Sequence, residues 1–255
     1  METRIRLTLE YDGSSYHGFQ MQKNALTVQE VLEEAIFKLT GERISLVCAG
    51  RTDAGVHALG QVVAFNSSST IPAARWKLAL NTLIPEDIRV VESQATHSRF
   101  NPRYDARSKR YVYLIYRSAL GSIFYRHYAL CTSEALDLTA MQEGAGLLVG
   151  CHNFRAFCAS GSSAKTFVRR VIKCRLEEKG PFMRLDIEGQ GFLYNMVRII
   201  MGTLLEVGRG KHPSSWIKEV LESQDRKAAG PTVPAQGLYL VKVFYPDIQS
   251  EPEKS

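Results

Sequence analysis

Hydrophobic and polar residues alternate over residues 4–11, which is the pattern of a half-buried strand. Helical periodicity begins after Thr27, and Glu30 stands three residues later, as in a capping box. We expect this helix to run to about Leu39 and to end at Gly41, because glycine readily takes the left-handed conformation of a helix end. Further elements are expected as strands at 44–48, 61–65 and 88–93 and as a helix, opened by Pro72, over 73–83.

The second half of the chain repeats this succession of elements without a repeat in the amino-acid sequence. Its pattern predicts strands at 109–116, 168–177, 182–188 and 237–245 and helices over 138–148, 192–207 and 215–221. Gly208 is placed to end the longest of these helices, and segment 118–134, which has little periodicity, is interpreted as the crossing between the halves. Strands and helices mix without strict alternation, which favours an α+β fold with a largely antiparallel central sheet flanked by helices.

The domain organisation follows from length and the absence of a linker. The 255 residues suit one large domain or two small ones that share a core. No low-complexity segment separates the halves, so we expect them to share one continuous sheet. We predict an N-terminal α/β subdomain over 1–105, a C-terminal α/β subdomain over 106–248 and a polar, frayed tail over 249–255.

Composition narrows the class of protein. Apolar residues make up 45% and charged residues 23% of the chain, as in globular proteins that fold in water. No apolar run reaches the roughly 18 residues of a membrane span, and the first residues lack the features of a secretory signal, so we expect a cytoplasmic protein without membrane contact. The five cysteines show no metal-ligand spacing, which predicts reduced, mostly buried thiols and no metal site.

The net charge of +6 favours a polyanionic partner. The cations gather in three clusters, and aromatic residues at 100, 104, 111, 113 and 116 interleave with the first. Cations bind phosphates and rings stack on bases, so the mixture indicates RNA; the alternative is a solvated strand face with core aromatics at alternate positions. The first basic cluster is Arg99, Arg103, Arg107, Lys109, Arg110 and Arg117, the second is Lys165, Arg169, Arg170, Lys173 and Arg175, and the third is Arg209, Lys211 and His212.

A polar hinge between two predicted strands is the first candidate for chemistry. In CAGRTDAGVHALGQVVAF, residues 48–65, two glycines bracket Arg51 and Asp53. By itself, the pattern is typical of a turn in which the aspartate accepts backbone N–H groups. The functional alternative is a positioned carboxylate that a neighbouring arginine holds ionised. His57 suggests either a general base or a loop donor that fixes the turn, of which the second is the commoner.

A buried cation and a tyrosine are the second and third candidates. The helix FLYNMVRIIMGTLLEV is apolar almost all round, yet Arg198 lies in its middle. A buried guanidinium needs a carboxylate, and Asp53 is a strong candidate for that partner; the alternative is that Arg198 reaches the surface along its stem. Tyr111 follows the basic pair at 109–110, where it can stack on an extruded base and take part in proton transfer.

These stretches together resemble the TruA-type tRNA pseudouridine synthases. AGRTDAGVHALGQVVAF resembles the signature of the family, and LEYDGSSYHGFQMQ, FNPRYDARSKRYVY, GFLYNMVRIIMGTLLEVG and GLYLVKVFYPD extend the match over nearly the whole chain. Two departures are Asn101, where histidine is frequent, and CHNF at 151–154, which replaces a commoner acidic form. Both look peripheral to the chemistry.

The resemblance implies roles for five residues. Asp53 matches the catalytic aspartate, Tyr111 the tyrosine that packs against the target base, and Arg198 the arginine that pairs with the carboxylate. Arg51 and Arg103 match substrate-binding arginines. The implied fold is the pseudouridine synthase fold, with the active-site cleft between its two similar subdomains.

The resemblance also implies a homodimer that needs no cofactor and isomerises uridines at positions 38 to 40 of the tRNA anticodon stem-loop. Whether the aspartate acts as nucleophile or as base stays open. Two other hypotheses remain beside this one: an RNA-binding protein without catalysis on the same fold, and a pseudouridine synthase that acts on other RNA.

Overall fold

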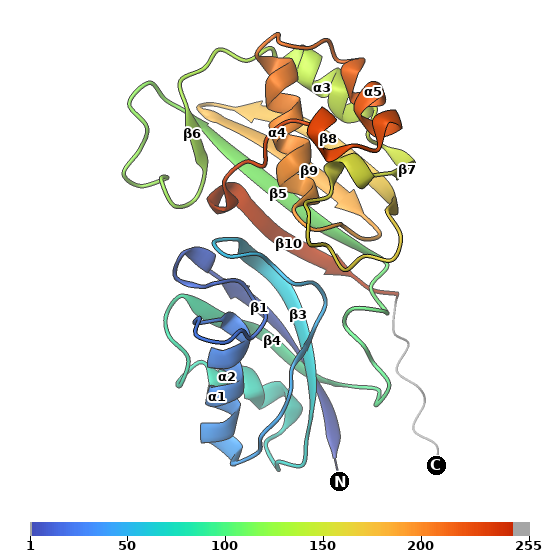
Figure 1. Cartoon of the computed structure of the whole chain (residues 1–255). Helices are drawn as coiled ribbons and strands as arrows, with labels where there is room; N and C mark the ends of the chain where they lie inside the picture. The colour runs from blue at the N-terminus through green and yellow to red at the C-terminus, as the bar shows by residue number, and fades with distance from the viewer. Residues whose placement is uncertain (1, 247–255) are drawn as a thin grey trace.

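One sheet runs through residues 2–246, the part of the chain that the computed structural model describes (Figure 1). The strands are β1 Thr3–Tyr11, β2 Val47–Cys48, β3 His57–Ser67, β4 Ile88–Thr96, β5 Ser108–Arg117, β6 Leu130–Thr132, β7 Gly150–Asn153, β8 Val168–Lys179, β9 Phe182–Gly189 and β10 Leu238–Phe244. Their order is β4-β1-β3-β10-β5-β9-β8-β7, with β2 beside β3 and β6 beside β5. The β10–β3 and β5–β6 pairings are parallel, and the other pairings are antiparallel.

Helices pack on each half of this sheet. They are α1 Val28–Thr40, α2 Trp76–Leu80, α3 Leu138–Gly146, α4 Met196–Gly208 and α5 Trp216–Ser223. In Figure 1, α1 and α2 lie beside β1 and β4, whereas α3, α4 and α5 gather over the strands of the other half. The mainly antiparallel sheet with flanking helices confirms the predicted α+β fold.

The capping chemistry of α1 is as predicted. The Thr27 hydroxyl accepts the Glu30 N–H at 3.3 Å, and Gly41 ends the helix with a φ of 73°. The helical stripe of α1 buries Val28, Leu32 and Ile36.

Two predicted helices are shorter than expected. The helix predicted over 73–83 is a 3₁₀ turn followed by α2, because Asn81 leaves the helix to exchange two hydrogen bonds of 2.9 Å with the backbone of Val90. The helix predicted from 192 begins at Met196, since Asn195 takes a left-handed φ of 58°. Its end is also displaced: Gly208 is still helical, and Gly210, with a φ of 71°, reverses the chain.

Strand predictions were least accurate where hydrogen bonding decides the boundary. The strand predicted at 44–48 is reduced to β2, whereas the one predicted at 61–65 begins at His57 as β3. The unperiodic segment 118–134 contains β6, and β7 was missed, because both are too short to show alternation. The predicted tail over 249–255 lies outside the described residues.

The two halves of the chain meet where β10 enters the sheet. β10 pairs with β3 over only two positions, Tyr239 with His57 and Leu240 with Ala58, and with β5 along most of its length. Thus, β10 holds β3, and the loop that precedes it, against β5.

The cysteines and helices bear on two further predictions. All five cysteines are free thiols. Only Cys158 and Cys174 are buried, so the prediction of mostly buried thiols is wrong for Cys48, Cys131 and Cys151.

Within residues 2–246, none of the helices has the length and apolar character needed to cross a membrane.

Candidate active site

The loop over residues 49–56, which we call the Asp53 loop, connects β2 to β3. Its backbone is tied to the chain near β1: Phe19 N–H donates to Thr52 O at 3.0 Å, and Gly55 N–H to Tyr16 O at 3.3 Å. Gly18 permits this approach, because a Cβ there would lie 2.6 Å from Thr52 O. The position of Asp53 is therefore fixed by neighbouring backbone.

Two buried polar side chains support the loop from beneath. The Gln61 amide donates to Gly50 O at 2.5 Å, and the hydroxyls of Tyr11 and Thr52 are 2.8 Å apart. Gln61 and Thr52 are almost wholly buried, so these hydrogen bonds do not exchange with water. The loop is consequently a preorganised support for the carboxylate.

Arg198 extends from the first turn of α4 toward this loop. Its Nε donates to Val233 O at 2.8 Å and its Nη1 to Asn195 Oδ1 at 2.7 Å. Only 17% of its side chain is exposed, so Arg198 does not reach the surface as the alternative interpretation required.

Asp53 and Arg198 form the ion pair that the sequence predicts, with 3.6 Å between Oδ2 and Nη1. No backbone N–H within residues 2–246 donates to the Asp53 carboxylate, so its interpretation as a turn cap is not supported. Burial raises the pKa of Asp53 above its usual range, and the charge of Arg198 opposes this rise. Arg198 thus favours the ionised form of the Asp53 carboxyl group, whose side chain is only 30% exposed to solvent.

Tyr111 of β5 is buried beside the same loop. Its hydroxyl lies 3.6 Å from the point where a Cβ on Gly50 would stand. Its ring meets Phe192 edge to face, with 5.0 Å between centroids. Burial raises the pKa of Tyr111, so its hydroxyl keeps its proton near neutral pH.

Arg51 and Arg103 are exposed, and neither forms an ion pair with a described residue. The Asn101 side chain accepts the N–H groups of Arg103 and Tyr104 at 2.9 and 3.2 Å, which builds a local turn. Asn101, one of the two departures from the family pattern, therefore has a structural role of its own.

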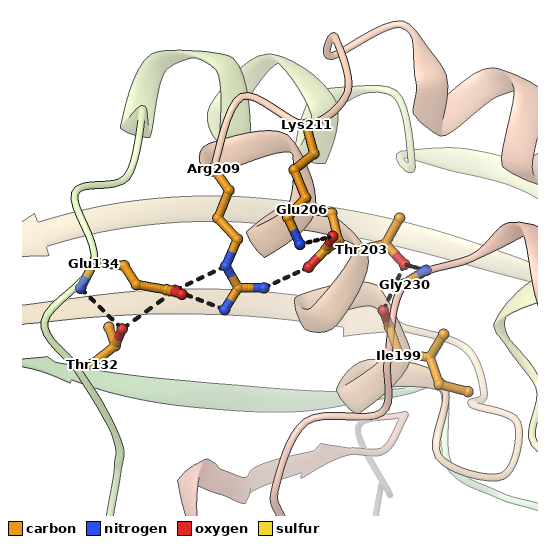
Figure 2. A network of polar contacts seen from close by, with 8 residues as sticks. All are labelled: Thr132, Glu134, Ile199, Thr203, Glu206, Arg209, Lys211 and Gly230. Atoms are coloured by element: carbon orange, nitrogen blue, oxygen red, sulfur yellow. Dashed lines mark hydrogen bonds and ion pairs between the residues drawn. The ribbon is translucent and has the colours of Figure 1, made fainter.

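Ion pairing distinguishes the basic residues that already have an acidic partner from those that do not. In the third cluster, Arg209 lies between Glu134 and Glu206, and Lys211 contacts Glu206 at 2.9 Å (Figure 2). These cations are already neutralised and join the end of α4 to the segment around Glu134. In the first and second clusters, Arg110 and Lys173 share Asp186, and Arg117 contacts Glu178. In the first and second clusters, the residues without an ion pair to a described residue are Arg99, Arg103, Arg107, Lys109, Lys165, Arg169, Arg170 and Arg175.

His57, the first residue of β3, has a structural role at the base of the Asp53 loop and is not a partner of the Asp53 carboxylate. Gly13 N–H donates to its Nδ1 at 3.1 Å, and its Nε2 lies 3.0 Å from His127 O and 3.2 Å from Gln236 O. Carbonyls only accept, so Nε2 carries the proton. Nδ1 accepts from Gly13 and lies 3.1 Å from Asp12 Oδ1, but burial lowers the pKa of His57 and so favours the neutral ring. His57 thereby connects three segments of the chain at the base of the loop.

A pocket of about 370 Å³ opens beside the Asp53 loop. Ser14, Ala54 and Gly55 line it from the first half, and Arg126, His127, Ala235 and Gln236 line it from the second. The loop therefore borders a recess between the two halves.

Sequence reasoning missed two residues that build the site. Asn195 orients Arg198, and its left-handed conformation is one that asparagine adopts more readily than most residues, so its place before the helix was a usable signal. Gln61 gave no such signal, because its role depends on the approach of β3 to Gly50 in space.

Comparisons with known proteins bear on the family of this chain. The profile of a family described as tRNA pseudouridine synthase matches residues 8–105 and 145–246. A protein named tRNA pseudouridine synthase A from Syntrophomonas wolfei subsp. wolfei is 65% identical over 245 residues, which are 96% of this chain and 98% of that protein. Its namesake from Acetivibrio thermocellus is 52% identical over 94% of this chain and 99% of the relative.

The family match covers both the loop that carries Asp53 and the helix that carries Arg198. Its two matched ranges extend over most of the sheet that brings those elements together. The chain therefore belongs to the tRNA pseudouridine synthase family.

Proposed function

We propose that this enzyme isomerises uridine to pseudouridine at positions 38 to 40 of the tRNA anticodon stem-loop, with Asp53 as its catalytic residue. The observation that carries the proposal is the convergence of Asp53, Arg198 and Tyr111 from a loop, a helix and a strand. A protein that only bound RNA would have no need of a shielded carboxylate held by a buried guanidinium.

The reaction exchanges one bond for another. The bond between N1 of uracil and C1′ of ribose breaks, the base turns, and C5 bonds to C1′. C5 loses its proton and N1 gains one, so the product is an isomer of the substrate. An ionised Asp53 acts at the sugar, as nucleophile or as base. Arg198 keeps that carboxylate ionised and oriented, which its pairing geometry allows.

Tyr111 has a role toward the freed base. Its ring stacks on uracil, and its hydroxyl assists removal of the C5 proton as a hydrogen-bonding group. Because burial raises its pKa, the hydroxyl acts as a protonated phenol and not as a phenolate.

RNA binding supplies the energy to expose the target base. Flipping a base out of a stem or loop costs a few kcal/mol, which contacts to the phosphate backbone must offset. The exposed, unpaired side chains of Arg51 and Arg103 are suited to these contacts. We further propose that the enzyme acts as a homodimer in which one tRNA contacts both subunits.

Release of tritium from tRNA labelled at C5 of uridine tests this function directly. We expect release from a tRNA with uridines at positions 38 to 40, and mapping should find pseudouridine there. Binding of tRNA without tritium release would overturn the enzymatic proposal. Release with modification at other positions, or in another RNA, would overturn only the assignment of the substrate site.

A further inference from the structure

Lys109 lies on the same face of β5 as Tyr111, two residues earlier. A Cβ on Gly50 would lie 3.5 Å from Lys109 Nζ and 3.6 Å from the Tyr111 hydroxyl. The ammonium and the phenol therefore border the same side of the Asp53 loop, three residues from Asp53 itself.

This ammonium has no anionic partner among residues 2–246. The next residue, Arg110, points to the other face and donates to Asp186, whereas Lys109 forms no ion pair or side-chain hydrogen bond with a described residue. Its cross-strand neighbours, Gly189 and Val243, carry no charge. A largely buried cation without a counter-charge is costly, so a site of this kind is suited to an anion that arrives with the substrate.

The charged groups that face Lys109 strengthen this interpretation. Burial lowers the pKa of Lys109 to about 8, Cys48 opposes that change, and the charge of Arg103 adds to it. Burial raises the pKa of the Cys48 thiol, and the charges of Lys109, Arg51 and Arg103 oppose the rise. The positive charges of Lys109, Arg51 and Arg103 thus act on the same half-buried thiol, which is neutral near pH 7, and their combined field attracts anions.

We propose that Lys109 is a positioning residue that binds a phosphate next to the target nucleotide, between the ammonium and the side chains of Arg51 and Arg103. The proposal rests on the proposed function, since a flipped uridine that reaches Asp53 and Tyr111 brings its flanking phosphates to the side of the Asp53 loop that Lys109 borders. A phosphate supplies the missing counter-charge and accepts the hydrogen bonds that the Lys109 ammonium does not make within the chain.

The consequence is a coupling between proton binding and RNA binding. A bound phosphate favours the charged ammonium, so the pKa of Lys109 rises toward its usual 10.5 in the complex. Above about pH 8 the free enzyme must take up a proton to bind RNA, and KM therefore rises with pH. Turnover of the bound complex does not share this dependence.

The test compares Lys109→Met and Lys109→Arg, with Lys179→Met as the control. Lys179 is an exposed lysine at the turn between β8 and β9. This turn lies beside the end of β5 opposite to Lys109. For Lys109→Met, we expect KM for tRNA to rise roughly tenfold and the slope of log Kd against log salt to fall by about 0.9, with kcat within about twofold. Lys109→Arg should restore low KM and remove its rise above pH 8, because arginine stays protonated there.

Three outcomes overturn the proposal. A fall in kcat of Lys109→Met at unchanged KM would assign Lys109 to proton transfer, and equal effects of Lys109→Met and Lys179→Met would leave only bulk charge. Measuring Kd for tRNA in an Asp53→Asn background separates this proposal from the proposed function, because binding is then read without turnover. If that Kd does not respond to Lys109→Met, phosphate binding is excluded even when the enzyme is active.

Discussion

The carboxylate of Asp53 lies 3.6 Å from the guanidinium of Arg198, and this ion pair joins the first half of the chain to the second. Arg198 is also anchored by Val233 and Asn195, so its position does not depend on Asp53 alone. The two residues can therefore be altered separately, each with a different expected result.

Replacement of Asp53 by Asn should abolish turnover and retain the fold. The amide is nearly isosteric with the carboxylate but is neutral and a poor nucleophile, so we expect activity to fall by at least about 10⁴-fold. Tritium release from labelled tRNA measures the activity, and circular dichroism and tRNA affinity serve as controls. Persistent turnover in Asp53→Ala would refute the catalytic assignment.

Replacement of Arg198 by Leu should separate stability from activity. Leucine avoids the desolvation of a buried charge, and the 30% exposure of Asp53 leaves that carboxylate some water, so the free energy of unfolding should change by less than about 2 kcal/mol. Activity should fall at least about 100-fold. Because Arg198 lowers the pKa of Asp53, its loss should move the acid limb of the pH–rate profile to higher pH.

Arg198→Lys is the matched variant for this experiment. It keeps the positive charge but not the fixed geometry of the guanidinium, so its acid limb should stay closer to that of the wild type. Unchanged turnover in a folded Arg198→Leu protein would show that the ion pair has no part in catalysis.

His57 should make the fold sensitive to mild acid. Burial lowers the pKa of His57 below its usual 6.5, and Asp12, 3.1 Å away, opposes this only in part. Below pH 6.5, the unfolded chain then binds more protons than the folded one. As the pH is lowered from 6.5 to the pKa of His57 in the folded protein, the free energy of unfolding therefore decreases by up to about 1.4 kcal/mol per pH unit.

Urea denaturation at pH 7.5 and pH 5.5 measures this contribution. His57→Gln should be less stable than the wild type at pH 7.5 but should lose less stability between the two pH values. His97→Gln, which alters an exposed histidine, should keep the full dependence. The same slope in all three proteins would contradict the assignment.

Ion pairing predicts which arginines bind RNA. Arg103→Gln should weaken tRNA binding and lower the slope of log Kd against log salt by about 0.9, because an unpaired cation releases a counterion on contact with a phosphate. Arg209→Gln should leave that slope unchanged and reduce stability, since Arg209 is held by Glu134 and Glu206 (Figure 2). Equal slopes for the two variants would refute this distinction.

Local patterns predicted the elements of this fold well where the deciding interactions are local. Thr27, Glu30 and Gly41 define α1 through contacts within one turn, and the sequence shows them directly. The start of α4 depends on the left-handed backbone of Asn195, and the end of α2 depends on hydrogen bonds between Asn81 and Val90 of the next strand. Such boundaries do not follow from periodicity.

The site divided in the same way. A buried charge demands a partner, which is why Arg198 could be matched to Asp53 from the sequence. A neutral support such as Gln61 makes no comparable demand, and His57 was recognised as a turn residue without its three contacts. Charge content also could not separate Arg209 from Arg103, since the pairing of Arg209 with Glu134 spans distant parts of the chain.

The pairing of β10 with β3 and β5 sets the order in which the enzyme becomes competent during synthesis. β10 is translated after every other strand of the described sheet, yet it is the strand that holds the Asp53 loop beside Tyr111. A nascent chain that has already made Asp53, Tyr111 and Arg198 therefore lacks an assembled site until residues 238–244 leave the ribosome.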